Sequence, residues 1–187
     1  MSQYNAIAID PGINHLGLCL STFSNNEIVE TTVKTIHVKE KLLDKKDIEK
    51  YGLRQCKIDF LNKELTLYLE LYHPKFFILE SPFFNMRRPA AFLPLVQLLY
   101  QFYITLRQEI PDCIYLTYPP SIIKKTLGAS AICKKQEVKE YVSKIEDFYK
   151  LSKDIILDEL DEHSIDALGV LYTFCQKDKD QLNENIH

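Results

Sequence analysis

Apolar and polar residues alternate along the first part of the chain as they do in β-strands. Residues 4–10 form an apolar run that ends in the carboxylate of Asp10. Residues 15–22 and 27–37 have the alternation and the β-branched composition of two further strands, joined by a turn that contains two asparagines. This pattern predicts that the chain begins with an antiparallel meander.

The spacing of apolar residues then changes from the period of a strand to that of a helix. Residues 39–50 are mostly charged, and no element is assigned to them. Beyond them, helical spacing and short apolar runs alternate. We expect helices at 53–72, 90–109, 134–149 and 163–176, and strands at 76–79 and 113–118. Ser121, after two prolines, is a candidate helix N-cap.

This order of elements predicts an α/β fold. A meander followed by strand–helix–strand units gives a mixed sheet, because consecutive strands joined by a helix lie parallel. We therefore expect a five-stranded mixed sheet flanked by helices. The length of 187 residues suits one domain, with 46% hydrophobic and 26% charged residues. We assign that domain to residues 1–177 and a polar tail to 178–187.

The cysteines and the N-terminus indicate a cytoplasmic protein. The five cysteines are odd in number and form no Cys-x-x-Cys pair, so reduced thiols are expected rather than disulfides or a thiolate zinc site. No signal-peptide pattern is present. The most apolar stretch, residues 90–106, is interrupted by Pro94 and two glutamines, and we interpret it as a buried or interfacial helix rather than a membrane span.

Three carboxylates and a histidine stand at the ends of the expected elements. Asp10 ends the first strand, Glu80 ends the fourth, and His163 and Asp166 begin the last helix three residues apart. Strand ends lie at the rim of a sheet, where ligand sites collect. Converging carboxylates repel one another unless a cation lies between them, and oxygen-rich donor sets suit Mg²⁺ or Mn²⁺. A two-metal phosphodiester site is the resulting hypothesis.

Each of these residues also has an ordinary structural explanation. Asp10 before Pro-Gly is typical of a turn, and Glu80 before Ser-Pro is typical of a loop. His163 alone is more typical of a hydrogen-bonded core histidine, and Asp166 of an acid that favours the helix dipole. Only the set of four, in this order on these elements, favours a metal site.

The residues that carry this set resemble a known family. Residues 8–12 (Ala-Ile-Asp-Pro-Gly), Gly17, Glu80 and residues 163–168 (His-Ser-Ile-Asp-Ala-Leu) are similar to the motifs of RuvC-type Holliday junction resolvases, which have the ribonuclease H fold. In that family the last motif usually has two aspartates three apart. Here His163 takes the place of the first, and Asp161 is an alternative ligand.

The resemblance extends to residues that contact DNA in the family. Phe83 stands where the family has an aromatic that inserts at the junction centre, whereas we expect Phe84 to pack into the core. Residues 120–128 and 134–138 resemble two lysine-containing segments of the family. The DNA-binding candidates are therefore Phe83, Arg87, Arg88, Lys124, Lys125, Lys134 and Lys135, with Lys124 also a candidate catalytic residue.

The resemblance implies a metal-dependent endonuclease that cuts four-way and other branched DNA by paired nicks. It implies two Mg²⁺ or Mn²⁺ ions for each active site and a homodimer, because a junction has approximate two-fold symmetry. The Lys-, Ile- and Asn-rich composition is typical of an AT-rich genome, bacterial or bacteriophage, and a phage-encoded protein would act in the host cytoplasm.

Three other functions remain open at this point. One is a different nuclease of the same fold, acting on RNA–DNA hybrids or on ribosomal RNA precursors. Another is an ATPase of the actin and sugar-kinase class, although the chain is short for two lobes and has only five glycines. The last is a junction-binding protein without catalysis, for which acids facing DNA would bring no advantage.

The net charge of −3 conceals an uneven distribution. Residues 1–153 carry 21 basic and 17 acidic side chains, whereas residues 154–187 carry two and nine. The acidic excess is therefore confined to the last segment, and it includes Asp166 at the predicted metal site. An acidic total does not exclude DNA as a partner, because the rest of the chain is basic.

Overall fold

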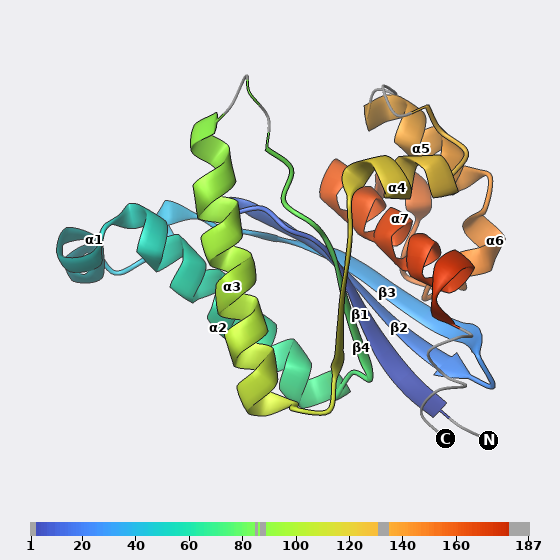
Figure 1. Cartoon of the computed structure of the whole chain (residues 1–187), viewed down its shortest axis with the longest axis horizontal. Coiled ribbons are helices and arrows are strands. Elements are labelled where there is room, and N and C mark those ends of the chain that lie inside the picture. Colours follow the sequence, from blue (N-terminus) through green and yellow to red (C-terminus); the bar gives the residue numbers. More distant parts are fainter. Residues whose placement is uncertain (1–2, 85, 87–88, 131–134, 180–187) are drawn as a thin grey trace.

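The computed structural model describes residues 3–84, 86, 89–130 and 135–179. Five strands and seven α-helices follow one another in the described chain (Figure 1). The strands are β1 (Gln3–Asp10), β2 (His15–Ser24), β3 (Glu27–His37), β4 (Phe76–Glu80) and β5 (Ile114–Tyr118). The helices are α1 (Lys45–Tyr51), α2 (Leu53–Tyr72), α3 (Phe92–Glu109), α4 (Pro120–Thr126), α5 (Lys135–Ser143), α6 (Glu146–Tyr149) and α7 (Glu162–Lys177).

The strands form one mixed sheet in the order β3-β2-β1-β4-β5. β1, β2 and β3 pair antiparallel, whereas β4 pairs parallel with both β1 and β5. The parallel pairing follows from the crossovers, since α2 connects β3 to β4 and α3 connects β4 to β5. The expected five-stranded mixed α/β sheet is confirmed.

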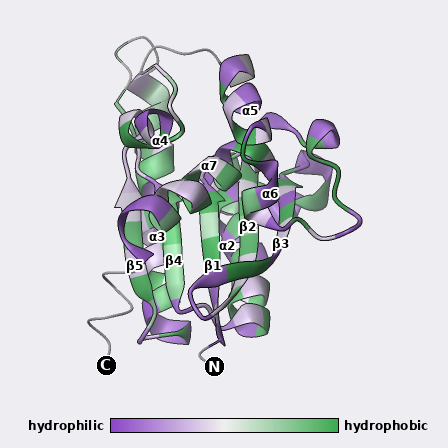
Figure 2. Cartoon of the chain, turned by 90° about the vertical axis from the view of Figure 1, so that its right-hand side faces the viewer, coloured by the Kyte–Doolittle hydropathy of each residue, from purple (hydrophilic) through white to green (hydrophobic). Residues whose placement is uncertain are grey.

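Alternate residues of the central strands face two separate hydrophobic cores. Ala6 and Ala8 of β1 belong to a core with α7, and Ile7 and Ile9 belong to a core with α2 and α3. Figure 1 shows α2 and α3 on one side of the sheet and α4 to α7 on the other. Figure 2 shows β1 and β4 as largely hydrophobic, as expected of strands that are covered on both faces.

Helix α3 has large apolar residues on its exposed side as well as on its buried side. Leu98, Phe102 and Leu106 are buried against the sheet and α2. Together with the preceding turn, Pro89–Glu109 is long and apolar enough to cross a membrane by length and composition alone, contrary to the expectation from sequence. Its buried face packs as a core helix, while Leu93 and Tyr100 remain more than half exposed.

The structure corrects the expected helix at 134–149. The chain forms α5 and α6 instead, with Ile145 outside helical geometry between them. The chain must turn here to run beside β3, where the Thr31 amide donates to the Lys150 carbonyl at 3.0 Å. Phe148 then packs edge-to-face against Tyr172 of α7, and Tyr149 is fully buried.

Two smaller expectations also differ from the structure. Ser121 is not an N-cap, because it lies inside α4. The N-cap is Pro119, two residues before Ser121, and the helix begins at Pro120. A proline fits there because it lacks only an N–H that has no partner in the helix. The charged stretch 39–50 contains α1, capped by the Asp44 carboxylate, which accepts from the amides of Lys46 and Asp47.

The last described residues are tied to the body of the protein. Asp178 accepts a hydrogen bond from the Tyr118 hydroxyl at the end of β5, and Lys179 donates to the Asn26 carbonyl at 2.6 Å. Both residues belong to the polar segment that follows residue 177. The four cysteines within the described chain (Cys19, Cys56, Cys113 and Cys175) are free thiols.

Candidate active site

Asp10 and Glu80 lie side by side at one edge of the sheet. β1 and β4 run parallel in a register whose last pair is Ile9 with Leu79, and the two acids directly follow that pair. Both strands therefore end at the same edge. The placement results from buried, strongly apolar strands that each finish in one half-buried carboxylate.

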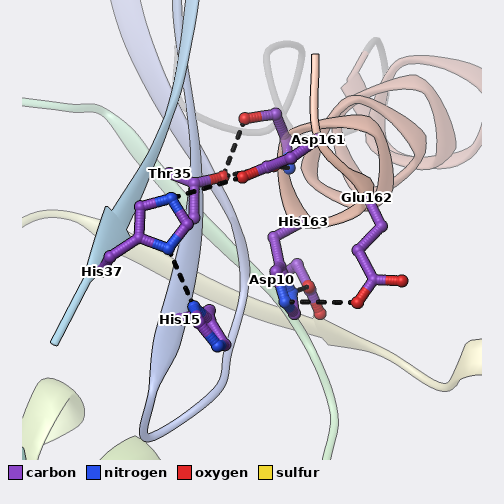
Figure 3. Close-up of polar contacts among 8 residues, drawn as sticks. Asp10, His15, Thr35, His37, Asp161, Glu162 and His163 are labelled. Atoms are coloured by element: carbon purple, nitrogen blue, oxygen red, sulfur yellow. Dashed lines mark hydrogen bonds and ion pairs between the residues drawn. The ribbon is translucent and has the colours of Figure 1, made fainter.

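The N-terminus of α7 brings His163 into contact with Asp10. The His163 Nδ1 atom is 2.8 Å from Asp10 Oδ2, and its Nε2 atom is 3.5 Å from Glu162 Oε1 (Figure 3). The side chains of His163 and Asp10 are only 20% and 15% exposed, so solvent screens this contact weakly. Of the two alternatives from sequence, His163 rather than Asp161 therefore meets Asp10.

Asp161 has a different structural place. It is the N-cap of α7, and its Oδ1 atom accepts from the Ser164 amide at 2.9 Å and from the Thr35 hydroxyl at 2.6 Å. Burial opposes ionisation of this carboxyl, but these hydrogen bonds hold its pKa below the usual value. The Asp161 carboxylate thus fastens the start of α7 to β3.

Gly17 permits the close approach of α7 to the sheet. Gly17 pairs with Asp10 in the β1–β2 register. A Cβ atom at this position would lie 2.1 Å from the His163 carbonyl oxygen and 3.3 Å from the Asp10 Cβ atom. Any side chain here would push the helix away from Asp10, so the contact between Asp10 and His163 depends on a glycine in β2.

Glu80, Asp166 and Lys124 line a neighbouring pocket of about 180 Å³. Asp166 lies three residues after His163 on α7, so the two side chains share a face of the helix. The apolar part of the pocket wall comes from α4, α5 and the residues between them (Pro120, Ile123, Leu127 and Val138). The structure therefore places the four predicted ligands and Lys124 in one region.

The donor types fit a divalent cation, although the arrangement is not that of a closed ligand cage. Carboxylates with one imidazole are the donors that Mg²⁺ and Mn²⁺ take. Within the part of the chain that the structure describes, no three His, Cys, Asp or Glu side chains are grouped closely enough to hold one ion. Asp10 pairs with His163, while Glu80 and Asp166 border the pocket.

The sequence of this chain is similar to that of a known nuclease. The crossover junction endodeoxyribonuclease RuvC of Cytophaga hutchinsonii is 24% identical over 164 residues, which cover 88% of this chain and 72% of that protein. This chain is RuvC-like. No protein-family model matches it.

Solved structures show the same fold. The Thermus thermophilus RuvC structure superposes with a TM-score of 0.64 at 18% identity, covering 90% of this chain and 92% of that chain. T. thermophilus RuvC in complex with its Holliday junction substrate gives a TM-score of 0.65 at 16% identity, covering 94% and 97%. The RuvC-like chain therefore has the ribonuclease H-like fold expected from its motifs.

The structure describes only some of the predicted DNA-contacting residues. Phe83 is 68% exposed, and Lys125 is exposed on α4 next to Lys124. Phe84 does not pack into the core as expected, because it is 52% exposed; its ring meets Phe92 edge-to-face. Arg87, Arg88 and Lys134 lie outside the described residues, as does the side chain of Lys135 at the start of α5.

Sequence reasoning missed two histidines beside this site. His15 begins β2 and His37 ends β3, and the antiparallel register pairs them directly. Burial, followed by the neighbouring His163 and His37, lowers the pKa of His15 and so favours a neutral ring. The predicted meander could have revealed this pair, because an antiparallel hairpin places the start of its first strand, His15, opposite the end of its second, His37.

Proposed function

We propose that this RuvC-like chain is a metal-dependent endonuclease that resolves four-way DNA junctions by paired nicks. The observation that carries the proposal is that the Asp10–His163 pair and the pocket lined by Glu80, Asp166 and Lys124 lie beside each other at one edge of the sheet. Acidic side chains aimed at DNA would only weaken binding, so their presence favours catalysis. The similarity to RuvC proteins supports the choice of a branched DNA substrate.

Asp10, Glu80, His163 and Asp166 would hold two Mg²⁺ or Mn²⁺ ions. Bound there, such ions would supply activation of the attacking water and stabilisation of the leaving oxygen of the phosphodiester. His163 contributes an imidazole that is already oriented by its contact with Asp10. Lys124, on the wall of the same pocket, is placed to stabilise negative charge on the scissile phosphate.

The loop after β4 is the proposed contact with unpaired bases. Phe83 is exposed only three residues after Glu80, so a base stacked on its ring would lie close to the cleavage site. Lys125, Lys134, Lys135, Arg87 and Arg88 complete the proposed DNA surface. These side chains attract the phosphates, whereas the acids at the start of α7 repel them. Bound metal ions would offset that repulsion, so we expect metal binding to strengthen DNA binding.

The exposed side of α3 is the proposed dimer interface. Leu93 is 56% exposed, Tyr100 66% and Tyr103 39%. Tyr100 and Tyr103 also line an open pocket of about 300 Å³ between α3 and β5, the edge strand of the sheet. Two copies related by a two-fold axis through this face would provide one active site for each of two junction strands. We propose a cytoplasmic location for this dimer.

Cleavage of a synthetic four-way junction tests this function. The parent protein should nick opposing strands in Mg²⁺ or Mn²⁺ and should be inactive with EDTA. Asp10→Asn should bind the junction and leave it intact. A linear duplex and an RNA–DNA hybrid at equal concentration are the competing substrates.

Three outcomes would contradict the proposal. Faster cleavage of the hybrid would indicate a different nuclease of this fold. Undiminished cleavage by Asp10→Asn would show that the site is wrongly assigned. Tight junction binding without cleavage by the parent, in the presence of either metal, would indicate a binding protein.

A further inference from the structure

Three histidines from three different elements gather beside Asp10. They are His15 at the start of β2, His37 at the end of β3, and His163 in the first turn of α7 (Figure 3). The proposed chemistry uses only His163. The other two form a hydrogen-bonded group that ends on the ring of His163, and this group has no role in the function described so far.

The ring of His15 lies flat against the ring of His163. Their centroids are 5.1 Å apart, and the planes differ by only 17°. This stacking restricts rotation of the His163 imidazole about its Cβ–Cγ bond. That torsion, χ2, otherwise has only a broad preference. The backbone of His163 is restricted as well, because its carbonyl oxygen lies against Gly17. Both restraints come from β2.

His15 is itself held in place by its neighbour on β3. The Nδ1 atoms of His15 and His37 are 2.9 Å apart, and the rings meet edge-to-face at 5.1 Å. The His37 Nε2 atom is 3.5 Å from Asp161 Oδ2. A consistent set of protons exists for neutral rings, in which His37 donates from Nε2 to Asp161 and accepts at Nδ1 from His15.

Asp161 is a rigid end point for this group of side chains. Its other carboxylate oxygen accepts from Thr35 at 2.6 Å and from the Ser164 amide at 2.9 Å. The group of Asp161, His37 and His15 therefore runs from the N-cap of α7, through β3 and β2, back to the ring of His163. These contacts connect the N-cap of α7 to the imidazole ring of His163 in the first turn of the same helix.

We propose that His15, supported by His37 and Asp161, is a positioning residue that holds the imidazole of His163 in the orientation that meets Asp10. The inference rests on the proposed function, because that function gives His163 its task. An imidazole fixed before metal binding loses less freedom when it becomes a ligand. A support of this kind typically changes metal affinity or activity by about 10- to 100-fold.

The first test observes His163 in the metal-free protein. Long-range ¹H–¹⁵N NMR at pH 8 reports which ring nitrogen carries the proton and whether it is hydrogen bonded. We expect one tautomer in the parent, with Nδ1–H donating to Asp10. In His15→Ala the two tautomers should mix. In His15→Phe, which keeps a flat ring, the signal should stay close to that of the parent.

The second test separates positioning from folding. Junction cleavage by His15→Ala should need about tenfold more Mn²⁺ for half-maximal rate, yet reach within about threefold of the parent rate at saturating Mn²⁺. Thermal midpoints should differ by less than about 2 °C. His73→Asn is the matched control, because His73 is an exposed histidine that ends α2 beyond the opposite end of β1.

His37→Ala removes the support without touching His163, and it decides the question if His15→Ala fails to fold. It should show tautomer mixing and a smaller rise in the Mn²⁺ requirement. The inference is overturned if His163 keeps a single tautomer in both alanine variants, or if His15→Phe is disturbed as much as His15→Ala. Failure of the proposed function can be told apart from failure of this inference. In that case the parent would not cleave junctions, whereas the NMR test on the metal-free protein would still report how His163 is held.

Discussion

The two halves of the candidate site are built differently. Asp10 and His163 belong to a network of side-chain polar contacts and one pair of stacked rings that reaches across β1, β2, β3 and α7. Glu80, Asp166 and Lys124 instead form part of a pocket wall between β4, α4 and α7. The first half lies among contacts that join four elements, whereas the second lines a space in which a substrate or ion would fit.

This difference predicts how substitutions will act. A change at Asp161, Gly17 or another residue that holds α7 on the sheet should affect stability and activity together, whereas a change at the exposed His15 or His37 should affect mainly activity. A change in the pocket half should affect activity with little effect on stability.

Glu80→Gln should abolish catalysis and spare the fold. We expect junction cleavage to fall by more than about 100-fold, because the substitution removes a proposed metal ligand rather than a residue that merely supports one. The thermal midpoint should stay within about 2 °C of the parent value, measured by circular dichroism. Glu70→Gln, at an exposed position of α2, is the control. A large loss of stability would remove the contrast between the halves.

Gly17→Ala should destabilise the hydrogen-bonded half. The added Cβ atom would lie 2.1 Å from a backbone oxygen of α7, so the helix must shift. We expect a loss of about 3 kcal/mol in the free energy of unfolding, measured in urea. Gly52→Ala separates this clash from simple backbone strain, since Gly52 has a φ of 85° and no atom within 4 Å of an added Cβ. It should cost less than Gly17→Ala, about 2 kcal/mol, because its φ of 85° and ψ of 149° lie in a region that glycine alone occupies readily. Equal losses for the two variants would show that the close approach at Gly17 is unimportant.

Asp161→Ala should cost about 1 kcal/mol at pH 7 through loss of the helix N-cap. The pKa of Asp161 is lower in the folded protein than its ordinary value near 3.8, so the ionised carboxylate favours folding. This contribution is fully present above about pH 4 and is lost as the pH falls through the folded pKa. The difference in stability between parent and variant should therefore shrink on acidification. A difference that stays constant down to pH 2 would mean that the carboxylate charge has no part in it.

Phe83→Ala and Phe84→Ala probe the loop beside the pocket half. Both rings are more than half exposed, so each variant should unfold within about 0.5 kcal/mol of the parent. Only Phe83→Ala should weaken junction binding, by about tenfold in fluorescence anisotropy, because we assign base stacking to Phe83 alone. Equal weakening by both variants would contradict that assignment.

Much of the fold follows from local sequence patterns. The boundaries of α2 and β3 agree with the expected ones, because apolar periodicity is strong there and a charged stretch or a His-Pro stop flanks each element. The expected helix at 134–149 was wrong at Ile145. Its amphipathic pattern continues through that residue, whereas the break is imposed by the pairing of Lys150 and Leu151 with Thr31, more than 100 residues away in sequence.

The site divides in the same way. Asp10 and Glu80 were predictable neighbours, since two apolar strands that each end in an acid and lie parallel must bring those acids to one edge. The expectation that Phe84 would be buried failed because hydrophobicity alone does not say which of two adjacent rings finds space in the core. That depends on α3, whose Phe92 meets the Phe84 ring at the surface.

The amino-acid sequence by itself determined the order of elements, the mixed sheet and the identity of the acids at its edge, because these depend on periodicity and on contacts near in sequence. Only the tertiary structure decided that His163 rather than Asp161 meets Asp10, and that His15 and His37 stand beside it. Those contacts join β1, β2, β3 and α7. Their geometry depends on how closely α7 can approach the sheet, and the space at Gly17 sets that distance.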